Sequence, residues 1–333
     1  MVELTFDPAE ARTTEKQKDP QRASLGRLVL SDRIFKLLTR AAAAFVLIIL
    51  FGVIVTLIEG SLPALKHFGL SFLWTEDWNP VKQRFGALAP IYGTIVTSII
   101  AMLVAVPVGL GIAIFLTELC PQFLRRPIGI AIELLAGIPS IIYGIWGLFI
   151  FAPFLQGTLQ PLLINTVGNV PGIGFLFAGP PYGIGVLTAG LVLAIMVLPF
   201  IASITRDVFE TVPPVLKESA YGLGATTWEV VWKVVLPYTR VGVIGGVMLA
   251  LGRALGETMA ITFVIGNAHR ISASVLQPGT TISAAIANEF VEAIETLHTA
   301  SLTALGLILF VITFIVLAAA RLLLATLNKR AGG

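Results

Sequence analysis

Residues 218–237 read ESAYGLGATTWEVVWKVVLP, a polar stretch between two strongly apolar segments of the chain. Prolines just before it favour the start of a helix. Proline lacks a backbone N–H, and in the first helical turn this group has no hydrogen-bond partner within the helix anyway. Glycines within it favour a turn, and a threonine pair can cap the helix that follows. The pattern predicts a short helix, a turn and a second helix that a proline ends near the membrane. The residues that carry the pattern are Pro213, Pro214, Gly222, Gly224, Thr226, Thr227 and Pro237.

The chain around this stretch is far more apolar than a soluble protein. Of its 333 residues 56% are hydrophobic and 12% are charged, and that charged share is roughly half of the share in a soluble domain. A membrane-spanning helix needs about 20 mostly apolar residues. Windows that qualify run over about 37–58, 94–117, 127–151, 183–204, 241–265 and 302–324. The sequence therefore predicts an all-α polytopic membrane protein with six transmembrane helices.

The stretch 152–182 is the difficult part of that count. It carries no Lys, Arg, Asp or Glu, yet many glycines and prolines interrupt it. A lipid-facing helix does not readily tolerate so many of these residues. We expect an apolar external loop with short interfacial or re-entrant helices, and a seventh span is the alternative.

The basic residues lie mostly on one side of the predicted spans. With the N-terminus inside, the internal segments 1–40, 118–126, 205–240 and 321–333 hold 17 of the 22 Lys and Arg residues. This positive-inside bias predicts that both termini are cytoplasmic. The predicted parts are a cytoplasmic, partly disordered tail 1–36, a first transmembrane helix 37–58, an external loop 59–93, a membrane core 94–325 that contains the cytoplasmic loop 205–240, and a cytoplasmic tail 326–333.

Several classes of function find no support in the sequence. No G-x-x-x-x-G-K-[ST] occurs, so the phosphate cradle of a P-loop ATPase is missing. One cysteine cannot form an internal disulfide, and three scattered histidines do not make a metal site. The net charge of +3 is too small to indicate nucleic acid. We therefore expect no enzyme activity, no catalytic residue, no metal ion, no cofactor and no nucleic-acid partner.

Two charged residues, Arg253 and Glu257, fall inside the predicted fifth span. Their spacing of four puts both on one face of a helix. A charge at the centre of a bilayer costs about 2.5–3.5 kcal/mol, so such residues normally face a partner or a wet cavity. A guanidinium binds an oxyanion such as phosphate or sulfate in two-pronged geometry. We interpret the pair as a substrate path, and the alternative is a self-neutralising pair that only holds helices together.

A carboxylate beside the guanidinium bears on which oxyanion would bind. It disfavours a fully deprotonated anion but can accept a hydrogen bond from a protonated phosphate, which sulfate lacks at neutral pH. The pair therefore favours phosphate.

Three further features concern helix packing. Small residues at a spacing of four, Gly242, Gly246 and Ala250, permit close approach of a neighbouring helix. The glycine and proline of AGIPSIIY (136–143) weaken or kink a helix, either for packing or as a hinge beside the path. Glu133 is expected to pair with a nearby arginine, Arg125 or Arg126.

The stretch 218–237 resembles the docking loop of ABC-importer permeases. In that loop EAA is followed by glycine four residues after the second alanine, and then by I-x-LP. The matching positions here are Glu218, Ser219, Ala220, Gly224, Val234, Leu236 and Pro237. Ser219 and Val234 depart from the family pattern by small changes.

Two other blocks resemble signatures of PstC-type permease subunits of phosphate-specific importers. They are AIELLAGIPSIIYGIWGL (131–148) and LGRALGETMAITFVIGN (251–267). The sister PstA-type subunit shares RALGET and the GIPS region, but TMAITFVIGN and the long charged N-terminal stretch favour the PstC type. The resemblance covers roughly residues 30–325.

The resemblance implies a type I ABC importer permease (MetI-like) fold in the plasma (inner) membrane, with 205–240 as its ATPase-coupling loop. It implies that Arg253 and Glu257 lie on a route for inorganic phosphate, driven by ATP hydrolysis on a partner. Implied partners are a PstA-like permease subunit, two copies of an ATP-binding subunit, an external phosphate-binding protein and membrane lipid.

Other readings stay open at this point. The oxyanion can instead be arsenate, sulfate or molybdate. An ion-coupled secondary transporter usually shows inverted repeats, which are not evident here, and a membrane scaffold would leave the two charges in the fifth span unexplained.

Overall fold

The computed structural model describes residues 20–331 of the chain, so that the first part of the predicted tail, 1–19, lies outside it. The chain divides into two units, 1–56 and 57–333, and each is considered by itself. Within the first unit, residues 20–36 are helical. The described residues contain helices and one isolated bridge, between Asn79 and Arg84, but no strand.

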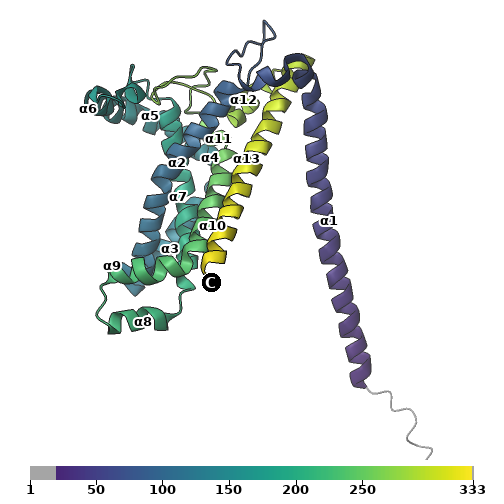
Figure 1. Ribbon diagram of the computed structural model, residues 1–333, viewed down its shortest axis with the longest axis vertical. Helices are drawn as coiled ribbons and strands as arrows, with labels where there is room; N and C mark the ends of the chain where they lie inside the picture. The colour runs from purple at the N-terminus through teal and green to yellow at the C-terminus, as the bar shows by residue number, and fades with distance from the viewer. Residues whose placement is uncertain (1–19, 332–333) are drawn as a thin grey trace, which may run out of the picture. The chain divides into compact units, whose positions relative to one another are not determined.

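Figure 1 shows the helices, coloured from purple near the N-terminus to yellow at the C-terminus. They are α1 (Pro20–Phe68), α2 (Leu88–Ile114), α3 (Gln122–Ala136), α4 (Ser140–Trp146), α5 (Ala152–Phe154), α6 (Gln160–Thr166), α7 (Val186–Glu210), α8 (Pro214–Gly222), α9 (Thr227–Val230), α10 (Leu236–Leu255), α11 (Met259–Thr262), α12 (Ile282–Glu289) and α13 (Thr296–Ala331). Short 3-10 or π turns extend or join them: η2 (Gly69–Leu73), η3 (Phe115–Leu119), η4 (Gly147–Phe151), η5 (Leu155–Leu159), η6 (Val167–Asn169), η7 (Gly174–Phe177) and η8 (Val231–Val235).

Six helical segments of the described residues are long and apolar enough to cross a membrane, as the sequence predicts. They are Ser31–Leu73, Leu88–Leu119, Ser140–Asn169, Val186–Glu210, Thr227–Leu255 and Thr296–Thr326. The predicted number of spans is thus confirmed for residues 20–331, whereas several of the predicted boundaries are not.

The third span differs most from its prediction. The helix is interrupted between Ala136 and Ser140, so that 127–151 is not one helix. From Ser140 the helix instead continues through π turns to Asn169. The stretch predicted as a loop with short helices therefore holds the short helices α5 and α6, but they belong to one helical run with α4. Two π turns, η4 and η5, lie within this run, and π turns occur mostly as single-turn bulges inside α-helices.

The other differences lie at helix ends. The first helix reaches Phe68 and α2 begins at Leu88, so the predicted external loop 59–93 is shorter in the structure. At the other end of the chain α13 runs to Ala331, so that most of the predicted tail 326–333 is helical. The fifth span ends at Leu255, ten residues before its predicted end at Ile265.

Helix α7 lies at the centre of the 57–333 unit, and α2, α10 and α3 pack against it (Figure 1). Small residues on α10 face α7, as their spacing predicts. A Cβ atom added to Gly242 would come within 2.6 Å of Val208, and one added to Gly246 within 2.6 Å of Ile204. Ala250, the next residue of this row, is fully buried. The row of small side chains therefore lets two helices approach closely.

The two ends of this unit carry different structures. The short helices α8 and α9 lie at one end, and α12 lies at the opposite end (Figure 1). Near α12 an apolar cluster joins the segment after α1 to α12 and α13. It includes Phe72, Phe85, Ile282 and Leu302.

Candidate functional site

The stretch 218–237 folds as two helical segments joined by a tight turn. Helix α8 begins at Pro214, directly after Pro213, and the turn closes through hydrogen bonds such as that from the Ala225 N–H to the Ala220 carbonyl at 3.1 Å. Gly224 in the turn has φ +85°, a left-handed conformation that glycine adopts without steric cost. The predicted helix–turn–helix is confirmed.

The second helix starts with a cap and does not stop where it was expected to stop. Thr226 and Glu229 form a capping box, in which each side chain binds the other residue's backbone N–H. This arrangement satisfies two donors that a helix start leaves without partners. The helix then runs unbroken from Thr227 to Leu255. The prediction that Pro237 ends it is wrong, because the π turn η8 just before Pro237 gives the proline ring room within a continuing helix.

The two faces of this loop differ in burial. Val230 and Val235 are buried in a cluster with Phe209 of α7 and Ala113 of α2. The opposite face is open and rich in large apolar side chains, Tyr221, Leu223, Trp228 and Trp232. The two tryptophan rings contact each other edge to face with their centroids 5.2 Å apart. Exposed aromatic and aliphatic groups gathered on one loop are typical of a protein-binding surface.

The residues predicted for coupling divide between these faces. Glu218 and Ser219 on α8 are exposed, as are Gly224 and Pro237, whereas Ala220 and Leu236 pack partly against the buried cluster.

A buried ion pair at the base of the loop was not foreseen from the sequence. The Lys217 Nζ lies 2.6 Å from the Glu118 Oε1, and these side chains are only 20% and 6% exposed. Glu118 belongs to η3, at the end of α2, and is 99 residues away in sequence. No sequence pattern links the two, because only the packing of α2 against this loop brings them together.

Arg253 and Glu257 do not form the pair that their spacing predicts. Helix α10 ends at Leu255, and Gly256 caps it, so the two residues do not share a helical face. The described residues show no ion pair between them. The Glu257 Oε1 instead accepts a hydrogen bond from the Ala260 N–H at 3.3 Å, at the start of α11. The end of α10 before Glu257 therefore separates the two residues.

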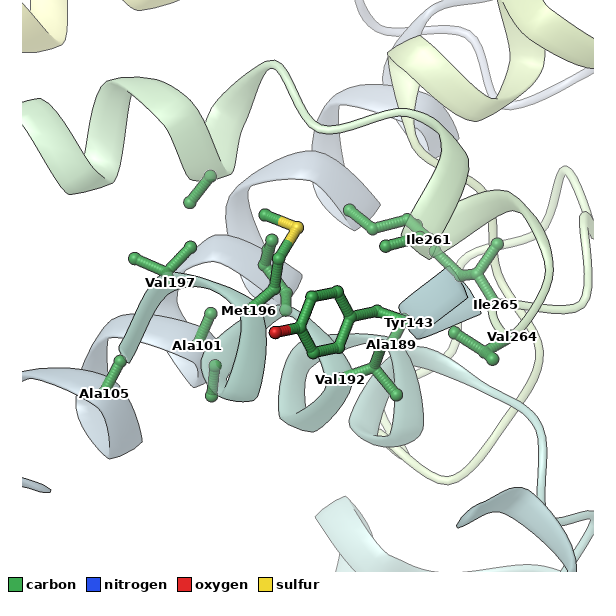
Figure 2. Close-up of a cluster of buried hydrophobic side chains, with 14 of the residues drawn as sticks. Ala101, Ala105, Tyr143, Ala189, Val192, Met196, Val197, Ile261, Val264 and Ile265 are labelled. Atoms are coloured by element: carbon green, nitrogen blue, oxygen red, sulfur yellow. The ribbon is translucent and has the colours of Figure 1, made fainter. Parts of the chain in front are cut away.

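Arg253 is exposed on the last turn of α10, where the negative end of the helix dipole stabilises a cation. The part of the chain that the structure describes offers its guanidinium no hydrogen-bond or ion-pair partner. Ala254, its neighbour on α10, belongs to the same buried cluster as Tyr143 of α4. Figure 2 shows the Tyr143 ring among the side chains of Met196, Val192 and Ile261. The charge of Arg253 is therefore available to an anion beside a well-packed core.

The break after α3 lies next to this region. Gly137 caps α3, and α4 starts at Ser140. The Tyr143 hydroxyl donates to the Leu135 carbonyl at 2.8 Å and so spans the break. The interruption that the sequence predicts around 136–143 is confirmed, and α4, which follows it, packs against α11.

Glu133 pairs with a different arginine from those expected. Its Oε1 lies 2.7 Å from the Arg206 Nη2 of α7, rather than beside Arg125 or Arg126. The Arg125 Nη2 donates instead to the Thr117 carbonyl at 2.7 Å. Helix α3 packs against α7, and this tertiary contact overrides the neighbours in sequence.

At the end of the 57–333 unit that carries α12, the carboxylate of Glu289 contacts ring nitrogens of three aromatic side chains. Glu289 accepts a hydrogen bond from the Trp78 Nε1 at 2.7 Å, and the Nε2 atoms of His269 and His298 lie 2.7 and 3.0 Å from its oxygens. Burial raises the pKa of Glu289, but hydrogen bonds from His269 and Trp78 outweigh burial, so its pKa lies below the usual 4.5. The cluster ties the segment before α2 to α12 and α13.

The lowered pKa of Glu289 predicts an acid-dependent loss of stability. A carboxyl group whose pKa is lower in the folded chain stabilises the fold above its unfolded pKa of 4.5, and that contribution disappears as the pH falls through the folded value. We expect the thermal midpoint of the unaltered protein to exceed that of Glu289→Gln at neutral pH, and the difference to shrink below pH 4.5. Thermal unfolding in detergent across pH measures this difference.

Glu292→Gln is the matched control, because Glu292 is an exposed neighbour and its loss should leave the midpoint unchanged. A difference for Glu289→Gln that stays constant into acid would show that its charge has no stabilising role.

The sequence has relatives among characterised families. Residues 105–329 match the family described as "Binding-protein-dependent transport system inner membrane component". The chain is 68% identical over 310 residues to "Phosphate transport system permease protein PstC" of Mesorhizobium japonicum, covering 93% of this chain and 95% of that protein. It is 58% identical over 301 residues to the protein of the same name from Pasteurella multocida, covering 90% of this chain and 94% of that protein.

Solved structures share the fold at low sequence identity. One is a bacterial alginate ABC transporter in complex with an alginate-bound periplasmic protein, with a TM-score of 0.59 and 17% identity over 88% of this chain and 94% of that chain. Another is an inward-facing methionine ABC transporter, with a TM-score of 0.54 and 16% identity over 72% of this chain and 94% of that chain. At these identities the likeness bears on the fold alone.

Proposed function

Because this chain belongs to the family of binding-protein-dependent transport inner-membrane components, we propose that it is the permease subunit of an ABC importer for inorganic phosphate. The observation that carries the proposal is near-full-length similarity to phosphate permeases, at 68% and 58% identity. The chain is a multi-pass protein of the inner membrane, and it conducts the anion without hydrolysing ATP.

ATP hydrolysis takes place on partner subunits that bind the coupling loop, residues 205–240. Its exposed face, with Tyr221, Leu223, Trp228 and Trp232, supplies the contact, and its buried face passes movement to the helix bundle. This arrangement needs the loop and both termini in the cytoplasm, in line with the positive-inside distribution of Lys and Arg.

The passage for phosphate runs beside Arg253 and Glu257. Arg253 supplies a guanidinium with no partner in the described part of the chain, which can bind two oxygens of the anion at once. Glu257 keeps one carboxylate oxygen on the Ala260 N–H, which leaves the other to accept the proton of a protonated phosphate. The missing ion pair between these residues supports a binding role, because neither charge is consumed by the other.

The complete importer contains further subunits. A PstA-like permease completes the passage, two copies of an ATP-binding subunit drive it, and an external phosphate-binding protein delivers the anion. Membrane lipid surrounds the apolar helices.

Uptake by reconstituted vesicles tests the function. The full complex should accumulate labelled phosphate only with ATP inside the vesicle and binding protein outside. Phosphate accumulation that needs no ATP and follows a proton gradient would instead indicate a secondary transporter. Protease or labelling access to Trp228 from the external face would contradict the orientation.

The selectivity role of Glu257 predicts a change in anion preference. Glu257→Gln keeps an oxygen for the Ala260 N–H but adds N–H donors in place of a negative charge. The preference for phosphate over sulfate should fall roughly tenfold, because one hydrogen bond to a charged group contributes about 1.5 kcal/mol. Competition by sulfate against labelled phosphate, bound to the purified complex, measures this ratio.

Met259→Leu provides the control for this experiment, because Met259 is a neighbouring exposed residue with no charge. An unchanged ratio in Glu257→Gln would remove Glu257 from the selectivity site.

A further inference from the structure

Helix α8 is joined to the helix bundle by one buried ion pair. The Lys217 Nζ and Glu118 Oε1 lie 2.6 Å apart, with Glu118 almost fully shielded from solvent. A second ion pair nearby, Lys233 with Glu229, lies within a single helical run and is largely exposed. Of these two ion pairs, the Lys217 pair is the one that connects the helix–turn–helix to another helix.

Helix α8 has little else to hold it. None of its residues is buried, and Ala220 is its single contribution to the apolar cluster beneath the loop. Its main packing is with α9 and η8 of the same loop. Besides this packing, the Lys217–Glu118 ion pair gives α8 a direct contact with η3, at the end of α2.

The Glu118 side of the ion pair is connected to further helices of the bundle. Glu118 lies in η3, and the carbonyl of its neighbour Thr117 accepts a hydrogen bond from Arg125 of α3 at 2.7 Å. Helix α3 runs from there to the break at Gly137. Across that break the Tyr143 hydroxyl binds the Leu135 carbonyl.

These contacts form a connected series from the coupling loop to the surroundings of Arg253. Tyr143 lies in the core with Ala250 and Ala254 of α10, the residues that flank Arg253. We infer that Lys217 is a positioning residue, which through Glu118 transmits movement of α8 to η3 and α3, and so couples ATP hydrolysis to the phosphate passage. This inference rests on the proposed function and deepens it.

The test measures phosphate transported per ATP hydrolysed, in vesicles that contain the full complex. Lys217→Gln leaves the exposed tryptophan face intact, so the ATPase should still bind and hydrolyse ATP. The transported phosphate per ATP should fall roughly two- to thirtyfold, the range found for residues that modulate coupling between sites. Glu118→Gln should give the same fall, and the exchanged pair Lys217→Glu with Glu118→Lys should restore the ratio to within about twofold.

Lys233→Gln is the matched control, because it removes an exposed ion pair from the same loop and should leave the ratio unchanged. Loss of one partner of a buried pair also destabilises a protein, so every rate is normalised to the assembled complex. Lys217→Arg, which retains the charge, should keep the ratio even if Lys217→Gln assembles poorly.

The outcomes separate the inference from the proposed function. A ratio that stays unchanged in Lys217→Gln, with activity falling only in step with the assembled complex, overturns the coupling role. A failure of the exchanged pair to restore the ratio also overturns it. An unaltered complex without ATP-driven phosphate uptake would instead refute the proposed function itself.

Discussion

Gly224→Asp should abolish phosphate uptake while the protein stays in the membrane. Gly224 has φ +85° in the turn between α8 and α9, a conformation that costs other residues about 1–2 kcal/mol. No atom lies within 4 Å of a Cβ added there, so the side chain would point away from the chain itself. The new carboxylate would therefore alter the face that binds the ATPase.

Three measurements separate the causes of this loss. Membrane-fraction amounts should be nearly normal, co-purification of the ATPase should fail, and uptake should be undetectable. Gly224→Ala introduces the strain without the charge and should retain part of the uptake. Gly222→Asp introduces the charge without a positive φ, and it should also weaken uptake because it adds a carboxylate to the same face. Normal uptake in Gly224→Asp would exclude the turn from the docking contact.

Arg253→Gln should lower phosphate uptake about 100-fold, because one hydrogen-bonded charge contributes up to about 3 kcal/mol. The residue is exposed on this subunit, has no partner in the described part of the chain and lies at the end of a helix. Its loss should therefore leave folding and ATPase binding intact. Uptake by vesicles, normalised to assembled complex, measures the effect.

Arg253→Lys distinguishes the geometry from the charge. Lysine retains a cation but cannot bind two oxygens in one plane, so its uptake should lie between those of the unaltered protein and Arg253→Gln. Full uptake in Arg253→Gln would place the phosphate passage elsewhere.

The sequence by itself determined the class of protein and its main elements. Long apolar windows can satisfy their backbone groups in a bilayer only as helices, so six spans follow from local composition. Turn and cap signals act within a few residues, and for this reason the helix–turn–helix, the capping residue Thr226 and the break around 136–143 are predictable. The row of Gly242, Gly246 and Ala250 likewise predicts a close helix contact from its spacing alone.

Other features depended on groups distant in sequence, and only the tertiary structure decided them. Hydropathy does not distinguish the end of a helix from a π turn within it. The ends of the third and fifth spans were therefore predicted at the wrong residues. Arg253 and Glu257 separate because α10 stops at Gly256, although a continuous helix would have paired them. Glu133 pairs with Arg206, and Lys217 pairs with Glu118, because helix packing brings their charges within hydrogen-bonding distance. Local propensity acts over a few residues, whereas these contacts form between helices far apart along the chain.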